Sequence, residues 1–291
     1  MNKVLKTFLL DLREKISLNM KKAIGDSNFI EKAMAYSSIS NSKMIRAGLI
    51  IASGKLNKNI HEDSLITLAT AIELIHTYSL IHDDLPSMDD DDFRRGKKSS
   101  HVKFGEANAI LSGDALQALA YEVICDDKKL SSNNKIKAIK LISNACGKNG
   151  MVLGQHLDIE SESKDLSVKA VENIHSLKTG KLIECSVMLG QINNNKKITE
   201  ALKIFGKKIG LAFQITDDIL EATSDQSILG KNSDSDTKNN KSTYIKVIGI
   251  EEAKKKSNKL SASAIKSLEE LGLKETNILI ELAKYISYRE K

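Results

Sequence analysis

Apolar residues recur every three or four positions along most of the chain. The N-terminal segment shows the pattern at Val4, Leu5, Phe8, Leu9, Leu12, Ile16 and Met20. Residues with this spacing share one side of a helix, so an amphipathic helix is predicted over residues 3–24. The same argument predicts helices over residues 42–53, 65–75, 110–123, 135–157, 168–190, 199–223, 250–271 and 276–288.

Polar runs separate these segments, and the alternating pattern of half-buried strands is absent. Aromatic residues make up 4% of the chain and Trp is missing, which would supply a β architecture poorly. We therefore expect an all-α protein. Asp63 and Thr199 precede apolar-periodic segments and are predicted N-caps. Residues 224–240 are rich in Asp, Asn, Ser and Lys, which is typical of a loop or lid.

Several predicted helices are apolar on more than one face, which indicates the interior of a large helical bundle. The length of 291 residues would allow two domains, but no shift of composition marks a boundary. A single domain over residues 1–291 is expected.

The net charge of +6, from 44 basic and 38 acidic residues, is small and not gathered in a basic stripe, which argues against nucleic-acid binding. Cys125, Cys146 and Cys185 lack the spacing of a zinc knuckle or a disulfide framework. The N-terminal apolar run is too short for a signal peptide, and no apolar stretch is long enough to cross a membrane. We expect a soluble, cytoplasmic protein without stable membrane insertion.

An acidic cluster follows the apolar helix predicted at residues 65–75. Residues 83–92 contain six aspartates, among them Asp83, Asp84 and Asp89. Carboxylates this close raise each other's pKa unless a cation is present, and Mg²⁺ is a hard ion that carboxylate and phosphate oxygens bind well. Taken alone, the run is compatible with a solvated acidic loop or with a metal site.

A second acidic cluster lies within an otherwise apolar helix. Asp217, Asp218 and Glu221 are spaced i, i+1 and i+4, so their carboxylates project to one side. A buried helix has no reason to carry such a face unless the face lines a cavity. Two acidic helix faces favour a metal cluster between them, and two solvated helix ends are the alternative.

Cations accompany both clusters. Arg94 and Arg95 follow the first one, and Lys43 and Arg46 lie at i and i+3 earlier in the chain. The protein uses Lys almost everywhere for positive charge, so a position that carries Arg suggests a need for its planar fork. Acidic clusters beside arginines are expected where a diphosphate is held partly by Mg²⁺ and partly by guanidinium groups. Further candidate cations are Lys178, Lys181, Lys231 and Lys241.

Other chemistries lack their motifs. The chain has no phosphate-binding loop of the Gly-x-x-x-x-Gly-Lys type, no dinucleotide fingerprint, no His-Glu-x-x-His and no nucleophile-elbow serine.

The ordered set of motifs resembles the trans-isoprenyl diphosphate synthases, and among them the bacterial farnesyl diphosphate synthases most. The resemblance runs through nearly the whole chain. It is carried by the segments His76–Asp89, Arg94–Gly96, His101–Leu116, Gly154–Asp158, Lys178–Lys181, Phe213–Asp218 and Lys241–Tyr244. This family implies a single bundle of helices around a central cavity, usually as a homodimer.

The resemblance also implies roles for individual residues. Asp83, Asp89 and Asp217 would bind several Mg²⁺ ions, supported by Asp84 and Asp218. Thr179 and Gln214 would face the reacting carbons, and Tyr78 would close the cavity below the growing chain and limit its length. The allylic diphosphate would be held by Arg94, Lys178, Lys231 and Lys241. Isopentenyl diphosphate would be held by Lys43, Arg46, His76 and Arg95.

The expected reaction joins isopentenyl diphosphate to dimethylallyl and then geranyl diphosphate. The allylic diphosphate departs with Mg²⁺ and cationic side chains stabilising its charge, the isopentenyl double bond attacks the carbocation, and a proton is lost. Alternatives are a geranyl or geranylgeranyl diphosphate synthase, or a non-catalytic subunit of a heteromeric prenyl synthase. A terpene cyclase is disfavoured by Asp217 and Asp218.

The chain departs from the family pattern at several positions. Asn41, Ser42 and Asn240 replace glycines, and Ala47 and Ile245 replace prolines. Glu221 stands in place of the last aspartate of the second motif. We expect metal binding to survive, since Glu is also a hard oxygen ligand, and the missing Gly and Pro residues to loosen loops.

Overall fold

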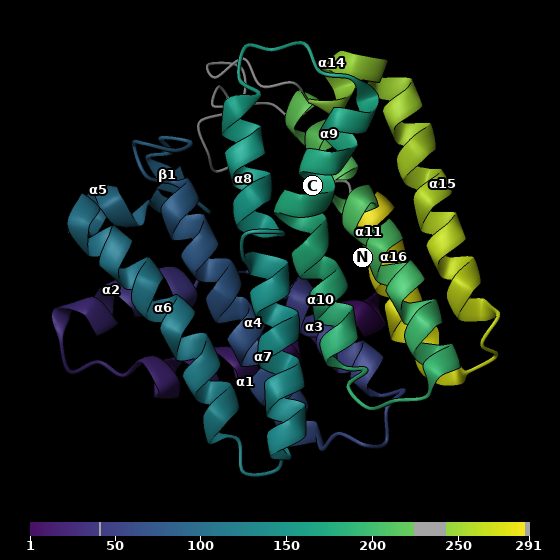
Figure 1. Ribbon diagram of the computed structural model, residues 1–291, viewed down its shortest axis with the longest axis horizontal. Helices are drawn as coiled ribbons and strands as arrows, with labels where there is room; N and C mark the ends of the chain where they lie inside the picture. Colours follow the sequence, from purple (N-terminus) through teal and green to yellow (C-terminus); the bar gives the residue numbers. More distant parts are fainter. Residues whose placement is uncertain (41, 224–242, 289–291) are drawn as a thin grey trace.

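The computed structural model describes residues 1–40, 42–223 and 243–288. Its helical elements fill most of the described chain, so the predicted all-α class is confirmed (Figure 1). They are α1 (Lys3–Ile24), α2 (Phe29–Ser38), α3 (Ile45–Gly54), α4 (Glu62–Asp83), α5 (Ser100–Phe104), α6 (Glu106–Asp126), α7 (Ser132–Cys146), α8 (Met151–Glu160), α9 (Val168–His175), η1 (Ser176–Gly180), α10 (Lys181–Leu189), α11 (Lys196–Thr223), α14 (Tyr244–Ile248), α15 (Ile250–Glu269), η2 (Lys274–Thr276) and α16 (Asn277–Tyr288). A hairpin is formed by β1 (Phe93–Arg94) and β2 (Lys97–Lys98).

Helix α4 is the centre of the bundle. It packs against α6 on one side and α3 on the other, and side chains such as Leu68, Ile72 and Leu74 have no exposed area. Its length and apolarity would suit a membrane span, but 78% of its most apolar window is buried inside the protein, as in a core helix. In Figure 1, α5 and α6 lie towards one edge of the bundle and α15 at the opposite edge.

A small apolar cluster is formed by Val171, Ile215, Tyr244 and Ala253, and two larger clusters hold most of the bundle together. One gathers residues of α1, α3, α4, α6, α7 and α10 around Ile72 and Leu116. The other joins α11, α15 and α16 to α3 through Leu49, Phe205 and Leu282. Both clusters contain residues of α3. This helix therefore packs against α4 in the first cluster and against α11 and α16 in the second.

The predicted helix over residues 135–157 is in fact two helices. It ends at Cys146 and resumes at Met151, with glycines at 147 and 150 in the break. A Cβ atom at Gly150 would lie 2.1 Å from the carbonyl oxygen of Ala145, so the chain turns where only glycine fits. Helices α2, α5 and α14 and the hairpin were not predicted.

Both predicted N-caps are wrong. Helix α4 begins one residue before Asp63, and its cap is His61, whose ring nitrogen accepts a hydrogen bond from the Asp63 N–H. Thr199 lies inside α11, where its hydroxyl donates to the carbonyl oxygen of Asn195. The predicted loop at 224–240 falls outside the described residues.

Candidate active site

The first acidic cluster is held by a folded turn after α4. The N–H of Asp89 donates to the carbonyl oxygen of Asp83 at 2.9 Å, which turns the chain back over the helix end. Asp84 and Asp91 are both almost fully buried and point at Arg94. The Arg94 Nε donates to Asp84 Oδ1 at 2.8 Å and an Nη donates to Asp91 Oδ2 at 3.1 Å. The predicted diphosphate ligand Arg94 is therefore fixed in place by two carboxylates.

Lys178 links the first cluster to another helix. Its ammonium donates to Asp158 Oδ2 at 2.7 Å and lies 4.0 Å from Asp89 Oδ2. Burial lowers the pKa of Lys178, but Asp158, Asp89 and Asp83 raise it by more, so the group stays charged. The same charge opposes the rise in the pKa of Asp83, which burial followed by repulsion from Asp89 brings to about 6.

A π-helical turn, η1, presents Lys178 and Thr179 to the site. Such turns insert one extra residue into a helix and are frequent at functional sites. Gly154 of α8 lies against this turn so closely that a Cβ there would be 2.2 Å from the backbone nitrogen of Lys178. Gly180 and Gly210 make a similar contact, with a Cβ at Gly210 lying 2.8 Å from the Gly180 Cα. Glycines on both flanks therefore allow the turn to fit between α8 and α11.

Thr179 begins a chain of hydrogen bonds that leads into the second acidic cluster. Its hydroxyl donates to Gln214 Oε1 at 2.7 Å, and Gln214 Nε2 donates to Asp218 Oδ1 at 3.2 Å. Asp218 is 6% exposed and also accepts the backbone N–H of Tyr244 at 2.8 Å. The structure thus brings together Thr179 and Gln214, which the family resemblance implies face the reacting carbons.

His175 and Glu172 complete this network from α9. His175 Nε2 lies 3.6 Å from Asp218 Oδ2, and its ring stacks on the ring of Tyr244. The Tyr244 hydroxyl donates to Glu172 Oε1 at 2.7 Å. Burial lowers the pKa of His175 to about 4, so the imidazole is neutral near pH 7. Sequence reasoning missed both residues, since neither belongs to a periodic or charge pattern.

Asp158 and Gln155 also lie in the site without a predicted role. Both stand in the Gly154–Asp158 motif, so the motif itself was the available signal. Asp158 holds Lys178 as described, and both polar atoms of the Gln155 amide are buried with no hydrogen-bond partner among the described residues. A buried amide of this kind can serve a bound polar ligand.

The residues predicted to hold isopentenyl diphosphate come from three elements. Burial, then the charges of Arg46, Arg95 and Arg94, keep the pKa of His76 well below its usual value. Arg46 also lies over the ring of Phe213 in α11, at 6.0 Å. Arg46, His76 and Arg95 therefore share one region beside the buried carboxylate of Glu73.

Lys43 stands apart from that group. It is exposed, and its ammonium lies over the ring of Tyr285 in α16, 5.9 Å from the ring centre. Lys231 and Lys241 lie outside the described residues.

Tyr78 is buried in the wall of α4. Its ring packs edge to face against the ring of His82, with 5.7 Å between the ring centres, and lies five residues before Asp83 on the same helix. Burial raises the pKa of its hydroxyl, and Cys146 and Gln117 lie beside it.

The predicted metal ligands lie on two elements. Asp83 and Asp89 belong to the end of α4 and the following turn, and Asp217 is half-buried on α11. Among the described residues, no three His, Cys, Asp or Glu side chains are grouped closely enough to hold one ion. The ammonium of Lys178 lies beside the Asp83 and Asp89 carboxylates instead.

Residues 27–277 match the family model described as polyprenyl synthetase. The chain is 43% identical over 269 residues to the farnesyl diphosphate synthase of Escherichia coli, and the match covers 90% of each protein. The chain belongs to the polyprenyl synthetase family.

Solved structures agree with this membership. An FPP/GFPP synthase of Zymomonas mobilis superimposes with a TM-score of 0.88 at 33% identity, covering 99% of this chain and all of the other. A geranyltransferase of Helicobacter pylori, solved with magnesium and isoprenyl diphosphate, superimposes with a TM-score of 0.84 at 29% identity over 98% of this chain and 97% of the other. The polyprenyl synthetase fold therefore extends over essentially the whole chain.

Proposed function

We propose that this polyprenyl synthetase is a Mg²⁺-dependent prenyltransferase that condenses isopentenyl diphosphate with dimethylallyl and geranyl diphosphate to give farnesyl diphosphate. The observation that carries the proposal is the junction at η1. Neighbouring residues there, Lys178 and Thr179, connect the first acidic cluster to the second through Asp89 on one side and Gln214 and Asp218 on the other. An arrangement of this kind suits a ligand that carries both negative charge and a reacting carbon.

The allylic diphosphate is assigned to Lys178 and Arg94, together with Lys231 and Lys241. Lys178 stays charged while buried, and its charge is balanced by Asp158 and Asp89. A diphosphate can replace these carboxylates as the partner of Lys178, because phosphate oxygens accept the same charge-assisted hydrogen bonds. Isopentenyl diphosphate is assigned to Lys43, Arg46, His76 and Arg95.

Asp83, Asp89 and Asp217 are the proposed Mg²⁺ ligands. Their hard carboxylate oxygens fit the ion. Burial, and to a smaller extent repulsion from Asp89 and Asp84, raises the pKa of Asp83, and a divalent cation would favour its charged form. When bound, Mg²⁺ supplies charge stabilisation to the departing diphosphate. The protein's own part is to hold the two acidic elements at a fixed separation, which the contacts of η1 with α8 and α11 support.

Thr179 and Gln214 are proposed to line the path of the reacting carbons. Their mutual hydrogen bond fixes the orientation of both polar groups. An oxygen held in this way is not free to turn and react with the allylic cation. A site of this kind has to exclude water, which would otherwise quench the cation. Tyr78 is proposed to limit the product to fifteen carbons, with ten-carbon and twenty-carbon products as the alternatives.

We also propose that the chain works as a cytoplasmic homodimer and forms a single domain over residues 1–291. The dimer proposal is supported by the outer face of α6, where Ile110 and Leu111 are 40% and 53% exposed. Apolar side chains at neighbouring helical positions are a common feature of subunit contacts.

The activity is tested by incubating the protein with isopentenyl and dimethylallyl diphosphates and Mg²⁺, and separating the products by chain length. Farnesyl diphosphate is the expected product. Asp83→Ala and Asp217→Ala should each lose activity by at least about a hundredfold, because each removes a ligand of the charge-stabilising ions. Asp165→Ala, in an exposed segment, is the matched control.

No prenyl product from the intact protein would overturn the proposal and favour the non-catalytic subunit. Near-normal activity of Asp83→Ala would overturn the metal assignment alone. Circular dichroism of each variant separates loss of the site from loss of the fold.

A further inference from the structure

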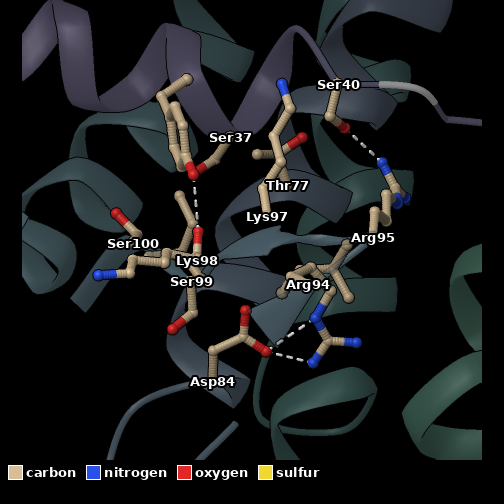
Figure 2. Close-up of a pocket in the computed structure, with 13 residues that line it drawn as sticks. Ser37, Ser40, Thr77, Asp84, Arg94, Arg95, Lys97, Lys98, Ser99 and Ser100 are labelled. Atoms are coloured by element: carbon tan, nitrogen blue, oxygen red, sulfur yellow. Dashed lines mark hydrogen bonds and ion pairs between the residues drawn. The ribbon is translucent and has the colours of Figure 1, made fainter. Parts of the chain in front are cut away.

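Neighbouring side chains hold the two arginines beside the first acidic cluster in place. Figure 2 shows Arg94 directed at Asp84, and an Arg95 Nη donating to the Ser40 hydroxyl at 2.7 Å. The second acidic cluster is held from a different part of the molecule, by α9, α14 and α15. On the basis of the function proposed above, we propose that Glu172 of α9 is a positioning residue that keeps the second cluster oriented for the condensation.

Glu172 joins three elements through one oxygen atom. Its Oε1 accepts a hydrogen bond from the hydroxyl of Tyr244 in α14 at 2.7 Å. The ammonium of Lys256 in α15 lies 2.8 Å from the same oxygen. Because both bonds end on Oε1, removal of this single carboxylate would release α14 and α15 from α9 together.

The ring of Tyr244 is enclosed by apolar packing. It is 1% exposed and belongs to the small cluster with Val171, Ile215 and Ala253, which come from α9, α11 and α15. A tyrosine hydroxyl at such a position needs an acceptor, since an unpaired buried hydroxyl is unfavourable. Glu172 supplies that acceptor and so fixes how the Tyr244 side chain sits between the helices.

The backbone of Tyr244 passes this constraint on to Asp218. Its N–H donates to Asp218 Oδ2 at 2.8 Å, while Asp218 Oδ1 accepts from Gln214 Nε2 at 3.2 Å. Asp218 is 6% exposed, and both of its oxygens are held. A shift of Tyr244 would therefore turn the Asp218 carboxylate and disturb its bond to Gln214.

Asp218 in turn determines which way the Gln214 amide points. An ionised carboxylate only accepts hydrogen bonds, so the amide has to present its Nε2 to Asp218. The amide oxygen then faces Thr179 and accepts from its hydroxyl at 2.7 Å. A continuous path of hydrogen bonds therefore leads from Glu172 to the two residues that are proposed to line the path of the reacting carbons.

This path does not include the groups assigned to isopentenyl diphosphate. Arg46 lies in α3, His76 in α4, and Arg95 in the turn between β1 and β2. Loss of the Glu172 contact should therefore lower kcat and leave the KM for isopentenyl diphosphate unchanged, because the interaction that is lost acts on the reacting carbons.

The test is steady-state kinetics of the full-length protein with isopentenyl and geranyl diphosphates and Mg²⁺, well below the unfolding temperature. Glu172→Ala and Tyr244→Phe should each lower kcat about tenfold, as is typical when a residue that orients functional groups from outside the site is lost. Glu172→Gln should keep most of the activity, because its amide oxygen can accept the same hydrogen bonds.

Ser257→Ala is the matched structural control. The Ser257 hydroxyl lies 2.9 Å from the Thr216 hydroxyl, so this variant also loses a buried hydrogen bond between α11 and α15. It leaves the path from Glu172 to Asp218 intact and should keep normal kcat. If Glu172 only supported the fold, Glu172→Ala would behave as Ser257→Ala does, and that result would overturn the proposal.

The double variant Glu172→Ala/Tyr244→Phe tests whether the two residues act through one bond. It should be no slower than the slower single variant, since each change removes the same bond. Effects that multiply would overturn the shared path. If Glu172→Ala does not fold, Tyr244→Phe settles the question, because it keeps the packed ring and removes only the hydroxyl.

Hydrogen–deuterium exchange separates this proposal from the proposed function. An unaltered chain that forms no prenyl product would overturn the function. The exchange of the Tyr244 amide, measured without substrate, reports on the positioning itself. This amide should exchange faster in Glu172→Ala than in Ser257→Ala, and equal exchange rates would overturn the role of Glu172.

Discussion

The backbone N–H of Ala47 shows how one residue compensates for a departure from the family pattern. It donates to Glu73 Oε1 at 3.0 Å, and Glu73 is 5% exposed. Burial raises the pKa of Glu73, and Arg46, this N–H and Arg95 oppose the rise. Proline, which the family usually has here, could not donate this bond. Alanine at position 47, within α3, therefore adds a contact between this helix and a buried carboxylate of α4.

Ala47→Pro should destabilise the protein by about 1–2 kcal/mol, because the lost buried hydrogen bond outweighs the smaller entropic gain from proline. Urea unfolding followed by circular dichroism measures the change. Ala47→Ser, which keeps the N–H, is the control. Equal unfolding midpoints for the two variants would show that the bond to Glu73 contributes nothing.

Tyr78 tests the assignment of product length. Tyr78→Ala should open space in the wall of α4 and shift the products to twenty carbons or more, at a cost of about 3 kcal/mol in stability. Tyr78→Phe keeps the ring and should keep the fifteen-carbon product. Chromatography of the products from both variants gives the answer, and an active Tyr78→Ala enzyme that still stops at fifteen carbons would mean that other residues set the length.

At the scale of elements, the contact between η1 and α11 leaves no room for a side chain at Gly210. Gly210→Ala would place its methyl carbon 2.8 Å from the Gly180 Cα and 3.0 Å from its carbonyl oxygen, and backbone atoms cannot rotate away. We expect a loss of about 1–3 kcal/mol in stability and a fall in kcat, because Lys178 and Thr179 shift with the turn.

Gly206→Ala is the matched control on the same helix. Its methyl carbon would lie 3.2 Å from the Glu184 Cα, so the shift needed is only a few tenths of an ångström, smaller than at Gly210. Urea unfolding and steady-state kinetics of both variants test the difference. If the two substitutions have the same effect, the close approach at Gly210 does not position the site.

The helices that the sequence predicted well are those with long, regular apolar periodicity, such as α1 and α11. Helix α2 was not predicted, and the break before α8 was missed because Gly147 and Gly150 interrupt a pattern that continues on both sides. The acidic faces could be predicted because each is local to one segment. Asp218 contacts His175 and the backbone N–H of Tyr244 only because the helices pack together, so no rule of sequence spacing could reveal these contacts.

At the scale of the whole molecule, the two faces of α6 differ in exposure. Ala109, Leu116 and Ala120 are fully buried against the bundle, whereas Ile110 and Leu111 point outward. A helix that belongs to the core on one side and to a subunit contact on the other would couple dimer formation to the position of α4, against which it packs.

Leu111→Glu should therefore convert a dimer to a monomer, because a carboxylate would be buried without a partner at the contact. Sedimentation velocity measures the change. Ile204→Glu on α11, where Ile204 is 45% exposed, is the control and should leave the dimer intact. A monomeric unaltered protein, or an unchanged Leu111→Glu dimer, would contradict the proposed interface.

The π-turn also limits which insertions and deletions the protein can tolerate. The turn at Ser176–Gly180 holds one residue more than an α-helical turn, so deleting one residue there would let a regular α-helix run from α9 into α10. The core contacts of α9 and α10 could then persist, whereas Lys178 would be displaced from Asp158. Insertions and deletions among relatives should accordingly accumulate in the loops, while the number of residues from His175 to Lys181 stays constant.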